Sequence, residues 1–264
     1  MIQTSSSSGG RSDAQRIVIL LAAIVQVAVT LLPSLGIGEQ IGDRSDGVRT
    51  LITPAGWAFS IWGLLYAASF AYAVYQLLPA QRNNGLIDRI GWASTGAFLG
   101  NAVWALYVQF NDLSAISALI ILFTLLCLLA CFRAFALARD PLRPGERFLV
   151  ALPLSLLAAW LTAATIVNIA ASLKFHGVEP QDAAPVAGAA VVLVGGLIAA
   201  TAIWNGRGNP WYALVFLWAL AGIHSGNAAD APEIGWAAIA SAILVAAAAL
   251  ARLSRSQDRR HWLG

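Results

Sequence analysis

Charged residues are scarce in this sequence of 264 residues. Asp, Glu, Lys and Arg make up 11% of the chain, whereas a soluble domain carries about 25%. Hydrophobic residues make up 59% before the 23 glycines are counted. This balance excludes a water-soluble globule, and it also excludes a disordered chain, which would be polar and highly charged. The net charge of +3 is too small to indicate nucleic acid as a partner.

Residues that hold metals or carry out catalysis are also few. Cys127 and Cys131 lie four residues apart within an apolar run, so we expect them to be small core residues rather than zinc ligands. The three histidines, His176, His224 and His261, are far apart, and no cysteine or carboxylate stands at ligand spacing from them. Neither a Walker phosphate loop nor a dinucleotide-binding glycine motif is present. We therefore expect no metal, no cofactor and no catalytic residues.

Long runs without charge dominate what remains. About 20 apolar residues are needed to cross the hydrocarbon core of a bilayer as a helix. The sequence predicts an all-α integral membrane protein with eight transmembrane helices, joined by short connections. The runs cover approximately residues 17–36, 55–78, 91–110, 113–136, 148–172, 185–204, 210–226 and 233–251.

The distribution of basic residues predicts the orientation. On one side of the eight runs lie thirteen of the Lys and Arg residues, and on the other side only three, Arg44, Arg49 and Lys174. By the positive-inside rule both termini are cytoplasmic, and a bacterial inner membrane is the expected location. We expect residues 1–14 to form a disordered tail and residues 254–264 a basic cytoplasmic tail. The middle of the runs lacks ionisable groups, which argues against a proton-coupled transporter.

Aromatic and amide side chains recur at helical spacing in three of the runs. Phe59, Trp62 and Tyr66 share one stripe of the second run, because they are three and four residues apart. By the same spacing Asn101 and Trp104 share a face of the third run. In the fifth run Trp160, Ala164 and Asn168 follow at intervals of four, and the small Ala164 leaves a gap between a large aromatic and an amide.

Two interpretations of these side chains stay open. A flat apolar ligand with a few polar edges would fit such a lining. Alternatively, the tryptophans belong to the aromatic belts at the membrane interfaces, and the asparagines join helices by hydrogen bonds. The belt interpretation is favoured for the tryptophans near the ends of the runs, which are Trp57, Trp92, Trp211, Trp236 and Trp262.

A third region of polar residues lies near the end of the seventh run. His224 is followed closely by Asn227 and Asp230. These residues either line a pocket at the outer face or, as we favour, place His224 as an interfacial cap of the seventh helix.

Three motifs resemble those of the TspO/MBR family, the tryptophan-rich sensory proteins related to the translocator protein. The second run contains TPAGWAFSIWGLLY, which is similar to the family's Pro-Pro-Gly-Trp-x-Phe element with its following tryptophan and Leu-Tyr. FLGNAVW in the third run matches the family's Leu-x-Asn-x-x-Trp. The tryptophan, alanine and asparagine of the fifth run reproduce the family's third motif. There are departures: Trp57 and Trp62 are one residue closer than in the family, and Ala55 replaces its second proline.

The resemblance implies a TspO-like bundle of five helices over residues 15–176, followed by an extension of three helices over residues 177–253. Family members bind porphyrins, sterol-like lipids and synthetic aromatic molecules, and the loop after the first helix closes over the pocket. The small residues Gly96 and Gly100 correspond to a region through which short members dimerise. The ligand-binding residues that the resemblance implies are Trp57, Trp62, Tyr66, Asn101, Trp104, Trp160, Ala164 and Asn168.

The function expected from these observations is a non-enzymatic membrane receptor or carrier for a tetrapyrrole, such as a porphyrin, or a sterol-like lipid. The partners are then this small molecule, the lipid bilayer and, as an open alternative, a second copy of the chain. Two other functions compete with it. One is a secondary-type transporter of a small hydrophobic solute, and the other is light-dependent degradation of porphyrin.

Overall fold

The computed structural model describes residues 11–264, and that part of the chain is helical without a strand. Eight long helices coincide with the eight apolar runs to within about four residues at each end, except at the end of the first run and the starts of the second and third, where the difference is six residues. Their bounds are α1 Asp13–Thr30, α3 Ile61–Tyr75, α4 Gly85–Phe110, α5 Ala115–Ala136, α7 Leu152–Phe175, α8 Ala184–Asn205, α9 Pro210–Asn227 and α10 Pro232–Leu253.

Short helical segments connect the long helices. Three are α-helical: α2 Ile41–Gly47, α6 Pro144–Glu146 and α11 Ser256–Trp262. Four are 3₁₀ turns, and one is a π turn that leads directly into α7. The turns are η1 Leu32–Leu35, η2 Gly56–Ser60, η3 Pro79–Gln81, η5 Gln181–Ala183 and the π turn η4 Arg147–Ala151.

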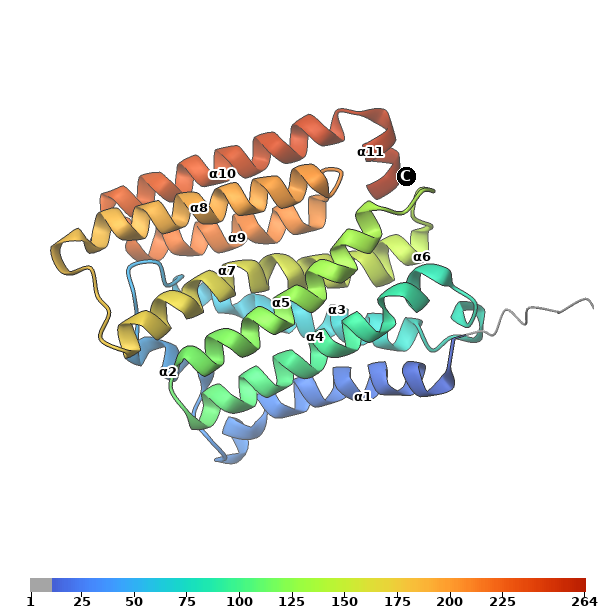
Figure 1. The fold of residues 1–264 in the computed structure, drawn as a ribbon, viewed down its shortest axis with the longest axis horizontal. Helices are drawn as coiled ribbons and strands as arrows, with labels where there is room; N and C mark the ends of the chain where they lie inside the picture. The colour runs from blue at the N-terminus through green and yellow to red at the C-terminus, as the bar shows by residue number, and fades with distance from the viewer. Residues whose placement is uncertain (1–10) are drawn as a thin grey trace, which may run out of the picture.

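The long helices form two groups that meet at α7 (Figure 1). In the first group α1 packs on α3 and α4, α4 packs on α5, and α5 packs on α7. In the second group α8 and α9 both pack on α10, and α9 joins the groups by packing on α7. Helix α7 is thus covered on both sides, and it is the most deeply buried of the candidate membrane helices. The first group is the five-helix bundle, and the second is the extension.

Both ends of the described chain lie at the same end of the molecule (Figure 1). This end, where α1 begins and α11 lies, is called the terminal end below. At the other end, called the opposite end, lie α2 and the connection between α7 and α8.

Helix starts follow the chemistry of the sequence. Asn209 caps α9, because its side-chain oxygen accepts hydrogen bonds of 3.1 Å from the backbone nitrogens of Trp211 and Tyr212. Pro210 occupies the first turn of the same helix, where a missing N–H costs no hydrogen bond. Gly208, which precedes Asn209, has a φ of +77°, a left-handed conformation that glycine adopts without strain.

Six helical segments of the described chain are long and apolar enough to cross a membrane, and the chain is accordingly an integral membrane protein. Both α4 and α9 fall outside this set. Polar side chains make both less apolar than the six: Asn101 and Gln109 lie within α4, and His224 and Asn227 lie in the last turn of α9. The six are Asp13–Thr30, Gly56–Tyr75, Ala115–Ala136, Pro144–Phe175, Gln181–Asn205 and Pro232–Leu253.

The C-terminal residues differ from the tail expected for residues 254–264. They form α11, which folds back onto the terminal end of the bundle. Trp262, expected as an interfacial anchor, is instead fully buried and donates a hydrogen bond of 3.1 Å from Nε1 to the Gly206 oxygen. Arg252 and Asp258 form a nearly buried ion pair of 2.9 Å beside it. The tail predicted at the N-terminus lies outside the described residues up to residue 10, and α1 begins at Asp13.

Small residues set the closest helix contacts, as expected for helices in membranes. A Cβ atom placed on Gly196 of α8 would lie 2.5 Å from Ser241 of α10, so this glycine brings together two helices of the extension. One on Gly96 of α4 would lie 2.9 Å from the Cys127 sulfur of α5, and one on Gly100 would lie closer still to Thr124 Oγ1. Gly96 and Gly100 thus face α5 of the same chain.

Candidate functional site

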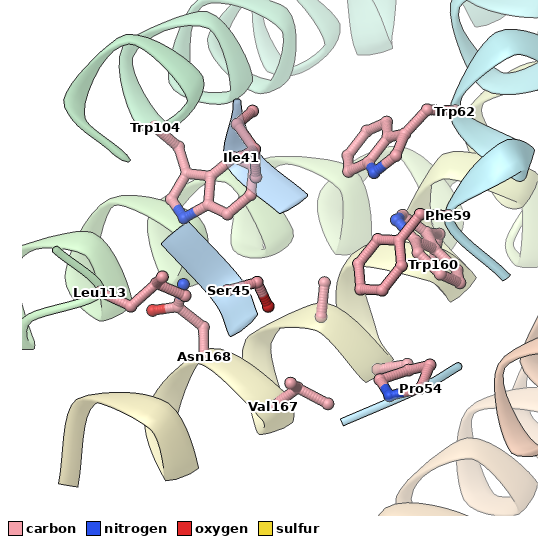
Figure 2. A pocket seen from close by; sticks show the side chains of 12 residues that line it. Ile41, Ser45, Pro54, Phe59, Trp62, Trp104, Leu113, Trp160, Val167 and Asn168 are labelled. Carbon is pink, nitrogen blue, oxygen red and sulfur yellow. The ribbon is translucent and has the colours of Figure 1, made fainter. Parts of the chain in front are cut away.

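A cavity lies between α2, α3, α4 and α7 in the half of the bundle near the opposite end (Figure 2). Its volume is about 50 Å³. The lining is almost entirely apolar and includes no Asp, Glu, Lys, Arg, His or Cys. The lining residues are Ile41, Ser45, Pro54, Phe59, Trp62, Trp104, Leu113, Trp160, Ala163, Ala164, Val167 and Asn168.

Four aromatic side chains, each from a different helical segment, form the walls of this cavity, called the tryptophan cavity below. The rings of Trp62 and Trp104 lie nearly parallel, with centroids 6.4 Å apart and an angle of 22°. Trp160 meets Trp62 edge to face at 6.1 Å, and it meets Phe59 in the same way at 5.9 Å. These are favourable aromatic geometries, so the walls are ordered before any ligand enters.

Buried donors without partners face this region. The Nε1 atoms of Trp104 and Trp160 and the Nδ2 atom of Asn168 make no hydrogen bond within the described chain. All three side chains are at most 5% exposed. The Asn168 amide is oriented by its oxygen, which accepts a 2.9 Å hydrogen bond from Ser117 Oγ. A buried donor left unpaired costs about 1–3 kcal/mol, and acceptor atoms on a ligand would remove that cost.

The short helix α2 covers the cavity. Ile41 and Ser45 of α2 lie over the space between Trp104 and Asn168 (Figure 2). The chain around α2 is fixed at both of its ends. Before α2, the Glu39 nitrogen donates to the Gln109 oxygen at 2.9 Å.

Two polar contacts complete the attachment of this lid. Within α2, Arg44 forms an ion pair of 3.3 Å with Asp112. After α2, Lys174 Nζ donates to the Arg49 oxygen at 2.8 Å. Each of these side chains is partly exposed, and such ion pairs contribute little stability. The polar contacts that hold α2 are thus individually weak.

The size of the cavity shows that the site is closed in this conformation. Sites for drug-sized molecules have volumes of about 300–1,000 Å³, and one water occupies roughly 30 Å³ of liquid. At about 50 Å³ the tryptophan cavity has room for a few waters only. A flat ligand can enter only when α2 or the aromatic side chains move.

Five of the eight site residues predicted from the sequence line the cavity, namely Trp62, Trp104, Trp160, Ala164 and Asn168. Helical spacing accounts for this agreement, because each stripe already pointed to one side of its helix. Tyr66 supports the lining from behind, since it stacks on Trp62 at 5.2 Å. Asn101 is buried outside the lining and donates to Gln26 Oε1 at 3.4 Å.

Trp57 does not reach the cavity. It is 45% exposed, donates from Nε1 to Ser225 Oγ at 3.0 Å, and meets Trp218 edge to face at 4.8 Å. Trp57 lies in the turn η2, outside α3, and its side chain contacts α9, whereas Trp62 lies in α3 and lines the cavity.

Several lining residues were absent from the sequence prediction. Phe59 shares the stripe of Trp62, and Ala163 and Val167 are neighbours of Trp160 and Ala164 on α7, so helical periodicity could have found them. The positions of Ile41, Ser45, Pro54 and Leu113 depend on tertiary packing. For Ile41 and Ser45 of α2 the one signal in the sequence was the family resemblance, which implies that the loop after the first helix closes over the pocket.

The extension holds one wall of the cavity in place. Three hydrogen bonds of 2.9 Å join α9 to residues 53–58, the segment that contains Pro54 and leads to Phe59. The Gly222 oxygen accepts from the Ala55 nitrogen, Asn227 Nδ2 donates to the Thr53 oxygen, and Trp218 Nε1 donates to the Ala58 oxygen. Glycine permits the approach, since a Cβ on Gly222 would lie 2.6 Å from the Ala58 Cβ.

Comparison with protein families gives one match. The model of a family described as TSPO-like protein matches residues 15–251. This range includes the five-helix bundle and continues through the extension, well beyond residue 176, where the motif resemblance ends. No curated protein and no solved structure matches the chain. The match confirms the family resemblance found in the sequence, and the family suggests a membrane receptor or transport role.

Proposed function

The chain belongs to the TSPO-like protein family, and we propose that it is a membrane receptor or carrier for a flat hydrophobic molecule, a tetrapyrrole such as a porphyrin or a sterol-like lipid. The ligand occupies the tryptophan cavity after α2 has moved. Trp62, Trp104 and Trp160 contact its faces, and Ala164 leaves room for its edge.

The unpaired donors of Trp104, Trp160 and Asn168 carry this proposal. Three buried N–H groups around one apolar space are costly in an empty cavity and favourable beside a ligand with acceptor atoms on its edge. A porphyrin or an oxygenated sterol has such acceptors. Helix packing alone would not require these donors to surround a cavity.

The membrane arrangement belongs to the same proposal. All eight long helices cross the bilayer, α4 and α9 being shielded from lipid on their polar sides by the other helices. The terminal end is cytoplasmic, since it carries most of the arginines, and the membrane is a bacterial inner membrane. The tryptophan cavity then lies in the outer half of the bilayer, and α2 lies at its outer surface.

The proposed role is non-enzymatic, because the lining holds no acid or base that could activate the Ser45 hydroxyl or a water. A second function, light-dependent breakdown of porphyrin, would depend on the tryptophans and on the photochemistry of the ligand itself. It predicts a product only under illumination in the presence of oxygen. Secondary-type transport of a hydrophobic solute would instead appear as uptake by proteoliposomes.

Titration of the purified protein with protoporphyrin IX tests the proposed ligand site, with tryptophan fluorescence as the signal. We expect saturable quenching that weakens in Trp62→Phe and Trp160→Phe. Trp236→Phe is the matched control, because Trp236 is 71% exposed and lies on α10 away from the cavity. Unsaturable quenching, or equal affinity in all three variants, would refute a porphyrin site in the tryptophan cavity.

A further inference from the structure

A second and much larger cavity lies at the opposite end, where the extension meets the five-helix bundle. Its volume is about 540 Å³, within the range of about 300–1,000 Å³ typical of small-molecule sites. Residues 49–52, the end of α7, the start of α8 and the end of α9 surround it. This junction cavity needs both helix groups, so a five-helix bundle without the extension cannot form it.

The walls of the junction cavity are apolar. Leu51 and Ile52 contribute from the segment after α2, Ala170 from α7, and Ala187 and Val191 from α8. Ile52 is only 3% exposed. Small side chains on α7 and α8 therefore leave a space that an acyl chain can fill.

Two cations stand together at one side of the lining. Lys174 is held beside Arg49 by the hydrogen bond from Nζ to the Arg49 oxygen. Their contacts with carboxylates are long, at 3.5 Å from Arg49 to Asp46 and 3.7 Å from Lys174 to Glu179. Strong charge-assisted hydrogen bonds measure about 2.7–2.9 Å, so both cations retain donors for an anionic group.

Acceptor groups come from the last residue of α9 and from the residues that follow it. Asn227 is 4% exposed, and its Nδ2 donates both to the Thr53 oxygen and to the Ile223 oxygen. No hydrogen bond within the described residues uses its Oδ1. Asp230, three residues further along, also lines the cavity and takes part in no ion pair of the described chain. This part of the lining suits a hydrogen-bond donor that carries positive charge.

We propose that the junction cavity binds a zwitterionic lipid with a primary ammonium group and a single acyl chain. Its phosphate contacts Arg49 and Lys174, its ammonium donates to Asn227 Oδ1 and Asp230, and its chain lies against the apolar walls. Electrostatics supports a neutral, dipolar headgroup, because the charged lining residues Arg49, Lys174, Glu179 and Asp230 balance in sign. Gln181, which also lines the junction cavity, has a φ of +46°. A positive φ is uncommon outside glycine, and such backbone conformations are often found at ligand sites.

Native mass spectrometry of the purified full chain with lysophosphatidylethanolamine tests this site. Lysophosphatidylglycerol of the same chain length is the comparison lipid, because it keeps the phosphate and lacks the ammonium. We expect the ethanolamine lipid to bind more tightly by roughly tenfold, the worth of one charge-assisted hydrogen bond. Equal affinity for the two lipids would overturn the assignment of the ammonium to Asn227 and Asp230.

Substitutions separate the junction cavity from lipid contacts elsewhere. Ala187→Phe fills the cavity and should abolish binding, whereas Ala190→Phe, an exposed position on the same helix, should leave it unchanged. Asp230→Asn should reduce the preference for ethanolamine, and Arg49→Gln should weaken both lipids while leaving the backbone contact of Lys174 intact. Equal effects of the two phenylalanine variants would overturn the proposal.

A last variant distinguishes ligand binding in the junction cavity from ligand binding in the tryptophan cavity. Ala164→Phe fills the tryptophan cavity only, so lysolipid binding should persist in it while porphyrin quenching is lost. Failure of lysolipid binding with intact porphyrin quenching would reject the junction site alone. Failure of porphyrin quenching with intact lysolipid binding would reject the proposed function alone. Thermal unfolding of each variant establishes that the compared proteins are folded.

Discussion

Trp218 Nε1 donates a hydrogen bond of 2.9 Å to the backbone oxygen of Ala58, which ties the extension to the turn before α3. Phe59, the next residue, forms a wall of the tryptophan cavity. The same indole also packs against Trp57. The extension is therefore part of the structure that defines the cavity, and changes in α9 should be felt by a ligand inside it.

Removing the indole hydrogen bond should lower ligand affinity without unfolding the protein. In Trp218→Phe the Ala58 oxygen loses the indole donor and keeps the hydrogen bond from the Ile61 nitrogen, at a cost of about 1 kcal/mol. We expect protoporphyrin IX affinity to fall several-fold, because the turn that holds Phe59 loosens. Fluorescence titration measures this, with Trp236→Phe as control. An unchanged affinity would show that α9 does not position the cavity wall.

Close packing at Gly222 should make that position intolerant of any side chain. A Cβ there would meet the Ala58 Cβ at 2.6 Å, whereas Gly63 on α3 has no atom within 4 Å of its added Cβ. Gly222→Ala should lower stability by about 1–3 kcal/mol through overpacking. Gly63→Ala should be neutral or stabilising, since alanine is the better helix former. The unfolding temperatures of the two variants should move apart, and equal temperatures would contradict the observed packing.

Weakening the attachment of α2 should accelerate ligand entry. Arg44→Gln removes the ion pairs with Asp112 and with Glu39, while the aromatic walls stay intact. We expect faster quenching by protoporphyrin IX in stopped-flow experiments. Arg82→Gln, which removes a surface ion pair with Asp13 at the terminal end, is the matched control. If Arg44→Gln and Arg82→Gln give the same rate as the unmodified protein, entry does not depend on the lid.

The attachment of α11 should weaken in mild acid. Burial first, and nearby Arg207 second, lower the pKa of His261 from its ordinary value of 6.5 to about 4. The neutral ring lies 3.1 Å from the Phe135 oxygen through Nε2 and 3.3 Å from Arg207 through Nδ1. Asp258 and Arg147 also act on it, the first raising and the second lowering the pKa.

The sign of this effect follows from proton uptake. Between pH 6.5 and about 4 the histidine of an undocked α11 binds a proton that the docked one excludes, so docking loses free energy as the pH falls through this range. Hydrogen exchange in α11, corrected for its intrinsic pH dependence, should show earlier opening at pH 5 than at pH 7. His261→Gln should remove this difference, and a difference of the same size in the variant would assign the effect to other groups.

The length of the apolar runs was enough to predict the eight long helices, because an apolar segment without charge has few alternatives to a helix in a bilayer. Helical periodicity then placed Trp62, Trp160 and Asn168 correctly around one space. Features that depend on the meeting of distant segments were not accessible in this way. Trp57 matches a family motif, yet it lies in the turn η2 and its side chain contacts α9. Trp262 lies beside arginines in the sequence, yet it is buried by α11 folding back.

The junction cavity shows a similar division between sequence and structure. In the sequence, Asn227 and Asp230 follow His224 near the end of an apolar run. One of the two interpretations of these residues was a pocket at the outer face, and the other was an interfacial helix cap. Their counterparts across the cavity, Arg49 and Lys174, lie more than fifty residues away in the chain. In the sequence these two residues contributed only to the count of charges on one side of the membrane.

Helix α7 presents one set of residues to each cavity. Ala164 and Asn168 line the tryptophan cavity, and Ala170 and Lys174 line the junction cavity less than two helical turns further on. A small shift or rotation of this single helix changes both volumes. Any difference that one ligand makes to the affinity of the other must be reciprocal and equal in free energy. A membrane lipid at the junction and a flat metabolite in the bundle would then act as mutual effectors, and the bilayer composition would set the sensitivity of the receptor.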